Sequence, residues 1–110
     1  MQFACLTKLN MSDSSDQVAG VLAPVTSLRH KGDLGIGDVG GLRKLVGWAV
    51  DHEVKFLQLL PINETGADDS PYNAISSVAL EPSLIDLSSV PEIGEARVNE
   101  VRAGLSEEFL

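Results

Sequence analysis

Two short apolar segments on either side of an amphipathic segment constrain the fold of this chain more than any other feature. The segments VAGVLAPV (18–25) and VKFLQLLPI (54–62) are apolar, partly β-branched and short enough to be buried strands. The segment between them, DVGGLRKLVGWAVDHE (38–53), has the spacing of a helix. This order predicts a βαβ unit, in which the strands are parallel and the crossover is right-handed.

The predicted helix over 38–53 has a capping residue and one apolar stripe. Asp38 can accept hydrogen bonds from the free amides of the first turn, where a negative charge also suits the helix dipole. The stripe comprises Leu42, Leu45, Val46, Ala49 and Val50. Gly40, Gly41 and Gly47 lower the helix propensity, so packing must stabilise this helix. We expect Gly47 to let another backbone approach closely.

The rest of the chain is less regular. We expect residues 1–17, which include the polar run NMSDSSDQ, to form a weakly ordered extension. Three further segments lack a regular period. Residues 26–37 and 63–77 are predicted to be two loops. Residues 78–95 are predicted to be an irregular stretch that runs into a linker. A terminal amphipathic helix over 95–110 is predicted from the spacing of Val98, Val101, Leu105 and Phe109.

A single βαβ unit does not make a complete domain. Two parallel strands leave two open edges and at least one uncovered face, whereas parallel sheets are normally buried on both faces. Two strands also rarely form a stable sheet alone. We therefore expect residues 18–110 to be an incomplete domain, the first piece of a larger α/β domain.

Composition excludes some classes of function. The formal net charge of -8 opposes attraction to nucleic acid or anionic membranes, so we expect neither as a partner. The single cysteine, Cys5, cannot form an internal disulfide and favours a reducing compartment, so we expect a cytoplasmic protein.

His30 and His52 lie far apart without the neighbours of a metal site, and we expect no metal and no cofactor. The basic run 29–31 predicts solvated surface.

Residues 35–40, GIGDVG, match the G-x-G-x-x-G pattern of dinucleotide-binding proteins and open a helix within a βαβ unit. Two physical objections oppose that interpretation. The first glycine follows Val25 only after a long loop, whereas the pattern needs it directly after the strand. Asp38 also lies at the helix start, where it would repel a phosphate. A glycine-rich loop that leads into an Asp-capped helix is the favoured interpretation.

The loop DDSPYN (68–73) leaves the carboxyl end of the second predicted strand, where α/β folds gather ligand sites. Its residue types are typical of turns, so it can simply connect two elements. It also combines carboxylates, a hydroxyl, an amide and a tyrosine. Those groups suit a polyol, because polar groups bind hydroxyls and an aromatic ring packs on the apolar face of a sugar.

Four segments together resemble the N-terminal region of the 4-α-glucanotransferases, the amylomaltase or disproportionating-enzyme family. They are GVLAPVTSLR (20–29), LGIGDVGGLRKLVGWA (34–49), FLQLLPINETG (56–66) and DSPYNAISSVALEPSLIDL (69–87). The resemblance implies the N-terminal part of a (β/α)₈ TIM barrel: the first βαβ unit and the following loop. It also implies a helix entry, not a nucleotide site, for the GIGD motif.

The resemblance implies an α-1,4-glucan or maltooligosaccharide substrate, transferred by a retaining double displacement that uses carboxylates. No residue of this chain matches those catalytic carboxylates, so we expect the isolated chain to be inactive. The implied substrate contacts are Ser70 and Tyr72, with Asp69 shaping the loop. Two alternatives stay open: a noncatalytic glucan-binding module, and a dinucleotide-binding domain that uses Gly35, Gly37 and Gly40.

Overall fold

The computed structural model describes residues 18–67 and 70–105. Two strands, β1 (Gly20–Ala23) and β2 (Phe56–Leu59), are separated by the helix α1 (Val39–Asp51), and a second helix, α2 (Gly94–Ala103), comes near the end of the described chain. Three short 3₁₀ turns complete the described elements: η1 (Val25–Ser27), η2 (Pro82–Leu84) and η3 (Leu87–Ser89). The predicted extension over 1–17 lies outside the described residues.

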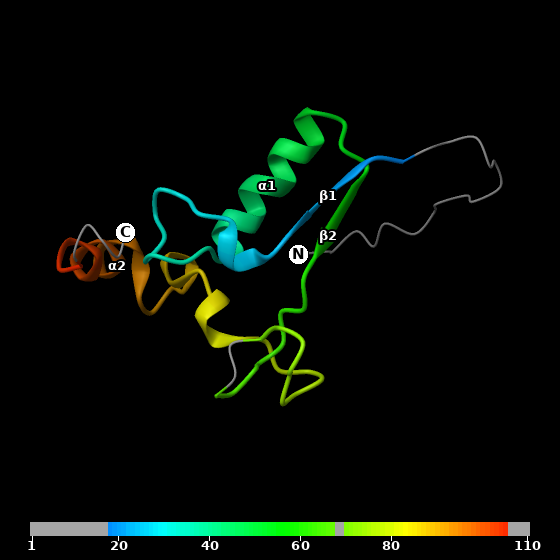
Figure 1. Ribbon diagram of the computed structural model, residues 1–110. Helices are drawn as coiled ribbons and strands as arrows, with labels where there is room; N and C mark the ends of the chain where they lie inside the picture. Colours follow the sequence, from blue (N-terminus) through cyan, green and yellow to red (C-terminus); the bar gives the residue numbers. More distant parts are fainter. Residues whose placement is uncertain (1–17, 68–69, 106–110) are drawn as a thin grey trace.

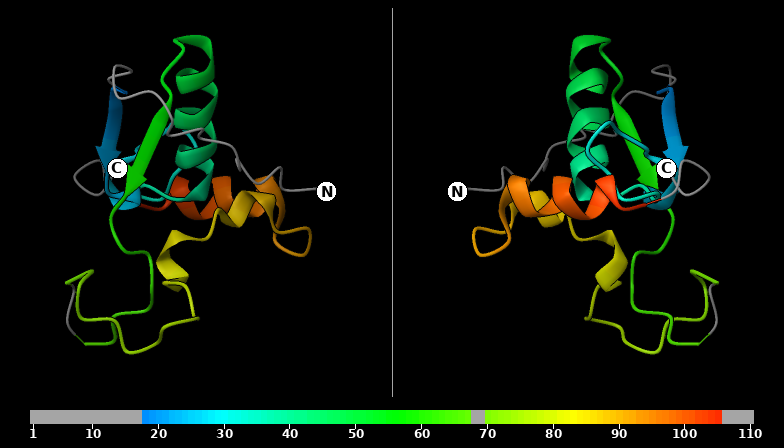
Figure 2. Two further views of the ribbon diagram at one scale, coloured as in Figure 1. Left: turned by 90° about the vertical axis from the view of Figure 1, so that its right-hand side faces the viewer. Right: turned by 90° about the vertical axis from the view of Figure 1, so that its left-hand side faces the viewer.

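The strands β1 and β2 pair in parallel, which confirms the βαβ arrangement. Gly20 lies opposite Phe56, and the register continues to Ala23 opposite Leu59. Both strands are shorter than the apolar segments that predicted them, because the prolines at 24 and 61 follow closely and cannot donate to the ladder. The helix α1 lies along one face of the strand pair (Figures 1 and 2).

Side chains alternate between the two faces of this small sheet. Val21, Ala23, Leu57 and Leu59 are buried or half-buried, whereas the other residues of the two strands are exposed. Leu22 is 58% exposed and Phe56 is 50% exposed, and both lie on the face away from the less exposed set. The sheet therefore has one covered face and one apolar face without cover from the described residues.

The start of α1 is formed as its sequence predicts. Asp38 accepts a hydrogen bond from the backbone amide of Gly41 at 3.1 Å, and the helix begins at the next residue, Val39. The predicted stripe is only partly buried: Ala49 is 4% exposed, but Val46 and Val50 are 45% and 71% exposed. Two described strands offer α1 a surface narrower than its apolar stripe.

The expectation of a close approach at Gly47 is wrong. No atom of residues 18–67 or 70–105 lies within 4 Å of the position that a Cβ would occupy there. The close approach occurs at Gly41, where a Cβ would lie 1.9 Å from the carbonyl oxygen of Leu28. The first loop, not a neighbouring helix, therefore requires a glycine in α1.

The helix α2 packs against η3, and Val98 is the buried residue of that contact. Of the predicted apolar stripe, Val101 is 46% exposed and Leu105 is half-buried, while Phe109 lies outside the described residues. Arg102 donates a hydrogen bond to the backbone carbonyl of Asp33 and so joins α2 to the first loop. Across the ranges 18–67 and 70–105, no helix is long and apolar enough to cross a membrane.

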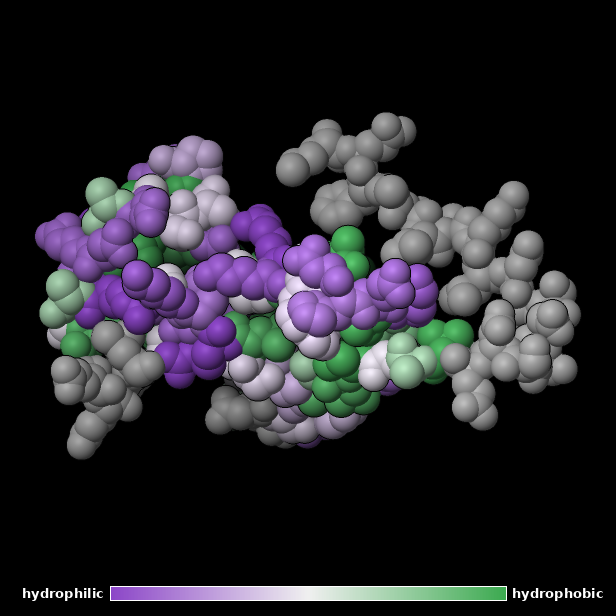
Figure 3. All heavy atoms as spheres, turned by 90° about the horizontal axis from the view of Figure 1, so that it is seen from above, coloured by the Kyte–Doolittle hydropathy of each residue, from purple (hydrophilic) through white to green (hydrophobic). Residues whose placement is uncertain are grey.

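On the face shown in Figure 3, polar side chains cover much of the described surface, and apolar side chains gather along its lower border. Exposed large apolar side chains also occur in the segment that follows β2. Ile75 is 68% exposed and Val78 is 87% exposed. Figure 1 shows this segment extending away from the strand pair and α1.

Candidate functional site

A pocket of about 330 Å³ lies at the carboxyl ends of both strands. The chain that leaves β1 contributes residues 24–26, and the chain that leaves β2 contributes residues 60–63. Ile36 from the first loop and Leu84 from η2 extend its apolar wall. Open parallel sheets bind their ligands outside the carboxyl ends of the strands, so this pocket is the candidate site.

Short backbone pairing after β2 builds the far side of the pocket. Asn63 forms an isolated antiparallel bridge with Leu80, and the amide of Glu81 donates to the carbonyl of Ile62 at 3.0 Å. The amide of Glu64 donates to the carbonyl of Ala79 at 3.1 Å. These bonds bring a segment that was predicted to be irregular against the end of β2.

The polar groups on the pocket wall differ from those that the sequence predicted. Five polar side chains line it: Thr26, Asn63, Thr65, Glu81 and Ser83. The sequence did not predict any of them as a ligand contact, and Glu81 in particular lies beside Pro82 in a stretch that was predicted to be irregular. The signal that could have found them is the strand end itself, since Asn63 and Thr65 follow β2 closely.

The predicted substrate contacts lie beside this pocket. Pro71 lines it, whereas its neighbours Ser70 and Tyr72 do not. The Tyr72 side chain is 71% exposed, and the carbonyl of Ser70 accepts a hydrogen bond from the amide of Asn73 at 3.0 Å within a turn. Asp69 lies outside the described residues. The roles of Ser70, Tyr72 and Asp69 stay predictions.

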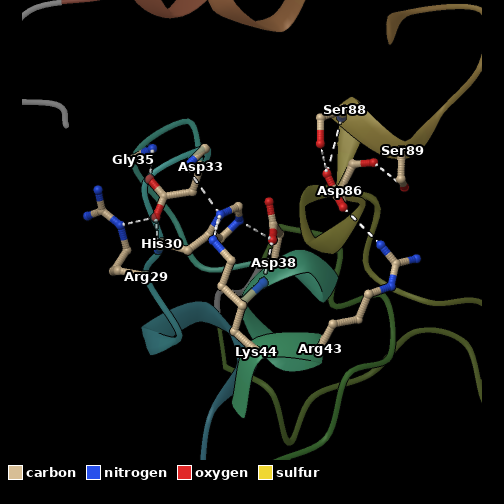
Figure 4. Close-up of polar contacts among 12 residues, drawn as sticks. Arg29, His30, Asp33, Gly35, Asp38, Arg43, Lys44, Asp86, Ser88 and Ser89 are labelled. Carbon is tan, nitrogen blue, oxygen red and sulfur yellow. Dashed lines mark hydrogen bonds and ion pairs between the residues drawn. The ribbon is translucent and has the colours of Figure 1, made fainter. Parts of the chain in front are cut away.

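The first loop folds around the carboxylate of Asp33, which is 1% exposed (Figure 4). It accepts hydrogen bonds from the Arg29 Nε at 2.8 Å, the His30 amide at 2.6 Å and the Gly35 amide at 3.1 Å. Burial alone would raise the pKa of Asp33, but these bonds outweigh it and lower that pKa from 3.8 to about 2. The carboxylate thus fixes the shape of the loop.

The expectation that residues 29–31 form only solvated surface is wrong for His30. Its side chain is 8% exposed, and its Nε2 lies 2.8 Å from the Asp38 Oδ1. Its Nδ1 accepts from the Gly32 amide at 3.2 Å, so Nε2 carries the proton that is donated to Asp38. Lys44 Nζ lies 3.3 Å from the same Nδ1 (Figure 4). His30 therefore ties the first loop to the start of α1.

A second buried carboxylate, Asp86, fixes the segment before α2. Its Oδ1 accepts from the amide and hydroxyl of Ser88 at 3.2 and 2.5 Å, and its Oδ2 accepts from Arg43 Nη1 at 3.0 Å. Burial opposes ionisation of Asp86, yet the Ser88 hydrogen bonds and the Arg43 charge lower its pKa. The network connects α1 to η3.

The geometry around the glycine motif disfavours a dinucleotide. The Asp38 carboxylate already caps the helix start, and a Cβ on Gly40 would lie 3.0 Å from oxygens of both Asp38 and Asp86. Two carboxylates at this helix start oppose the approach of a pyrophosphate. Gly35 has a φ of 98°, a conformation that glycine adopts readily. The motif shapes a turn and permits close packing.

Other chemistry finds little support in the ranges that the structure describes. No cluster of three or more histidine, cysteine, aspartate or glutamate side chains there could hold a metal ion. Trp48 of α1 stacks on His52, the residue directly after this helix, with ring centroids 4.8 Å apart. The pocket at the strand ends therefore remains the candidate site.

Comparison with known proteins gives a consistent match. The family model described as 4-alpha-glucanotransferase, glycoside hydrolase family 77, matches residues 23–109. Curated proteins of the same description match as well. The chain is 46% identical over 74 residues to the 4-alpha-glucanotransferase of Chlamydia pneumoniae, an alignment that covers 67% of this chain and 14% of that protein.

Two more distant relatives match similar stretches. The 4-alpha-glucanotransferase DPE2 of rice (Oryza sativa subsp. japonica) is 33% identical over 83% of this chain and 10% of its own length. The protein of Thermus thermophilus is 35% identical over 74% of this chain and 16% of its own length. The matched region thus spans a small part of each curated relative. No solved structure is significantly similar to this chain.

Proposed function

The chain belongs to the 4-alpha-glucanotransferase family, and we propose that it forms the first βαβ unit of a (β/α)₈ barrel that transfers α-1,4-glucan segments. In this proposal the chain contributes one wall of the glucan-binding cleft. The substrate is an α-1,4-glucan or maltooligosaccharide, and the acceptor is glucose or another glucan.

The observation that carries the proposal is the pocket at the carboxyl ends of β1 and β2. Active sites of (β/α)₈ barrels lie at this end, on the loops that follow the strands. The pocket combines apolar walls with neutral polar side chains and one carboxylate. Sugar rings present apolar faces and hydroxyl edges, so this lining suits them.

The uncovered face of the sheet supports the proposal that this chain is part of a barrel. Leu22 and Phe56 lie on the face away from the side chains that α1 covers, and both are at least half exposed. In a (β/α)₈ barrel the helices cover the outer face, and the inner faces of all strands pack together. Leu22 and Phe56 would then be interior residues of the barrel.

The carboxylates near the pocket do not suffice for the reaction. A retaining double displacement needs a nucleophile and an acid-base carboxyl about 5 Å apart. Among the described residues that line the pocket, Glu81 is the one with a carboxylate. We therefore assign the nucleophile and the acid-base to other strands of the barrel, and we expect binding without transfer from this chain alone.

The exposed ring of Tyr72 and the neighbouring Ser70 complete the proposed cleft. Tyr72 is 71% exposed beside the pocket, so its ring is accessible for stacking on a glucosyl unit. Ser70 would bind a hydroxyl, and Asp69 would hold the loop. These roles come from the family resemblance and rest on the DSPY motif.

Titration calorimetry with maltoheptaose tests this proposal. The chain should release heat on binding, and Tyr72→Ala should weaken binding about tenfold, because stacking of an aromatic ring is lost. Trp48→Ala, which removes an exposed aromatic ring from α1, is the matched control and should bind normally. Absence of heat at millimolar glucan would contradict the proposed cleft.

Incubation with maltotriose tests the second half of the proposal. Chromatography should detect neither glucose nor longer maltooligosaccharides, since one carboxylate cannot serve as both nucleophile and acid-base at once. Robust turnover would contradict the assignment of the catalytic carboxylates to other strands.

A further inference from the structure

We propose that Glu81 is the residue that selects a neutral, hydroxyl-bearing ligand in the pocket at the strand ends. Its carboxylate would accept hydrogen bonds from hydroxyls of one hexose ring. The inference rests on the proposed function and adds a binding residue outside the DSPY loop. It is carried by the placement of Glu81, by the lining of the pocket and by the charge of that lining.

The backbone of Glu81 is held in place. Its amide donates to the carbonyl of Ile62 at 3.0 Å, directly after β2, and the preceding Leu80 pairs with Asn63. The following residue, Pro82, restricts Glu81 to an extended conformation, and Glu81 has φ -61° and ψ 117°. The side chain therefore leaves a fixed point on the pocket wall.

The carboxylate of Glu81 is oriented but not saturated. Its Oε1 accepts from the Ser83 amide at 3.3 Å, which caps η2. No donor among residues 18–67 and 70–105 bonds to its Oε2. The residue is half-buried and lines the pocket. We therefore assign the second oxygen to a ligand hydroxyl, an interaction that leaves the cap on η2 in place.

The charge of the lining decides the class of ligand. The described lining contains no lysine, arginine or histidine, so Glu81 makes the pocket negative. A phosphate or carboxylate ligand would be repelled, whereas neutral hydroxyls are donors that a carboxylate binds well. A charge-assisted hydrogen bond of this kind is stronger than a bond between neutral groups.

The rest of the lining suits one sugar ring. Pro24, Val25, Ile36, Leu60 and Leu84 supply apolar surface, and the Asn63 carboxamide supplies further polar contacts. The cavity of about 330 Å³ is at the small end of the range for ligand pockets, about 300 Å³ upward. A single hexose unit, not a long helical glucan, is the fitting occupant.

Nuclear magnetic resonance titration of the full chain with maltotriose tests the inference. Binding should shift the backbone amide signals of residues 60, 62, 63, 83 and 84. It should weaken about tenfold or more in Glu81→Gln. This substitution keeps an oxygen that can accept from the Ser83 amide, so η2 stays capped. Glu81→Asp keeps the charge and should lose less affinity than Glu81→Gln. Thermal melts should show that both variants remain folded.

Glu64→Gln is the matched control, because Glu64 is half-buried in the same paired segment but does not line the pocket. It should bind maltotriose with unchanged affinity. Glucose 1-phosphate, an anionic probe, should bind the wild-type chain more weakly than glucose does, and Glu81→Gln should reduce that difference.

The outcomes separate the two proposals. Unchanged binding in Glu81→Gln, together with loss in Tyr72→Ala, would overturn the role of Glu81 and leave the proposed function intact. No binding by the wild-type chain would overturn both. Equal losses in Glu81→Gln and Glu64→Gln would show a general structural effect and would also overturn the inference.

Discussion

Arg43 of α1 donates a hydrogen bond to the carboxylate of Asp86 over 3.0 Å, although the two residues lie 43 positions apart in the sequence. The partners differ in burial: the Arg43 side chain is 63% exposed, and that of Asp86 is 10% exposed. Asp86 also accepts from both the amide and the hydroxyl of Ser88. Removal of Asp86 should therefore lower the stability of the chain more than removal of Arg43.

Arg43→Ala should lower the free energy of unfolding by at most about 1 kcal/mol, because the arginine is exposed and its ion pair is screened by solvent. Asp86→Ala should lower it by about 3 kcal/mol, since Ser88 and η3 lose their hydrogen-bond acceptor. Urea unfolding followed by circular dichroism measures both values. Equal effects would contradict the view that Asp86 organises this region mainly through Ser88.

The carboxylate of Asp33 should make the chain sensitive to acid. Its pKa is about 2 in the folded chain, against an ordinary value of 3.8, so it stabilises the fold fully above pH 4. That contribution, about 2 kcal/mol, should be lost as the pH falls from 4 towards 2. Asp33→Asn should be less stable at pH 7 and should show a smaller loss over that pH range.

Asp51→Asn is the control for this acid sensitivity, because Asp51 is an exposed carboxylate at the end of α1. It should retain the acid transition of the wild-type chain. A transition that persists unchanged in Asp33→Asn would show that other carboxylates cause the acid sensitivity.

Two glycines of α1 should respond in opposite directions to alanine. Gly41→Ala places a methyl group 1.9 Å from the Leu28 carbonyl oxygen and should destabilise the chain by about 3 kcal/mol. Gly47→Ala meets no atom of the described residues within 4 Å and should stabilise the chain by about 1 kcal/mol, because alanine has the higher helix propensity. Thermal unfolding of both variants measures the difference. Stabilisation by Gly41→Ala would contradict the close packing of the first loop on α1.

The open face of the sheet should bind apolar dyes. Leu22 and Phe56 are both at least half exposed on that face, so the wild-type chain should increase the fluorescence of anilinonaphthalene sulfonate. The double substitution Leu22→Thr and Phe56→Thr should reduce this fluorescence severalfold with little loss of stability. Val50→Thr, a substitution on exposed α1 surface, should change it less. An unchanged signal in the double variant would mean that the dye binds elsewhere.

Local patterns predicted the elements of this fold well. The spacing of apolar residues and the cap at Asp38 predicted α1, and the two apolar segments predicted parallel strands; both are confirmed. Such features depend on residues close together in sequence. The close approach was assigned to Gly47 because spacing alone does not show which face of a helix another backbone meets.

Long-range contacts account for what the sequence did not predict. The buried side chain of His30 contacts Asp38 and Lys44, and Arg102 donates a hydrogen bond to the Asp33 carbonyl. The position of Glu81 at the pocket depends on backbone pairing with the end of β2. None of these relationships has a local pattern, so the candidate site was predicted on the neighbouring DSPY loop and without Glu81.

The parallel register of β1 and β2 has a consequence for the order of folding. Because Gly20 pairs with Phe56, no hairpin can bring the strands together, and the whole intervening segment must first contract. Formation of α1 shortens that segment, since a helix rises only about 1.5 Å per residue. Substitutions that weaken the helix start, such as Asp38→Ala, should therefore slow folding as well as speed unfolding. Asp38 would then help to set the folding rate, because the helix that it caps brings the first two strands together.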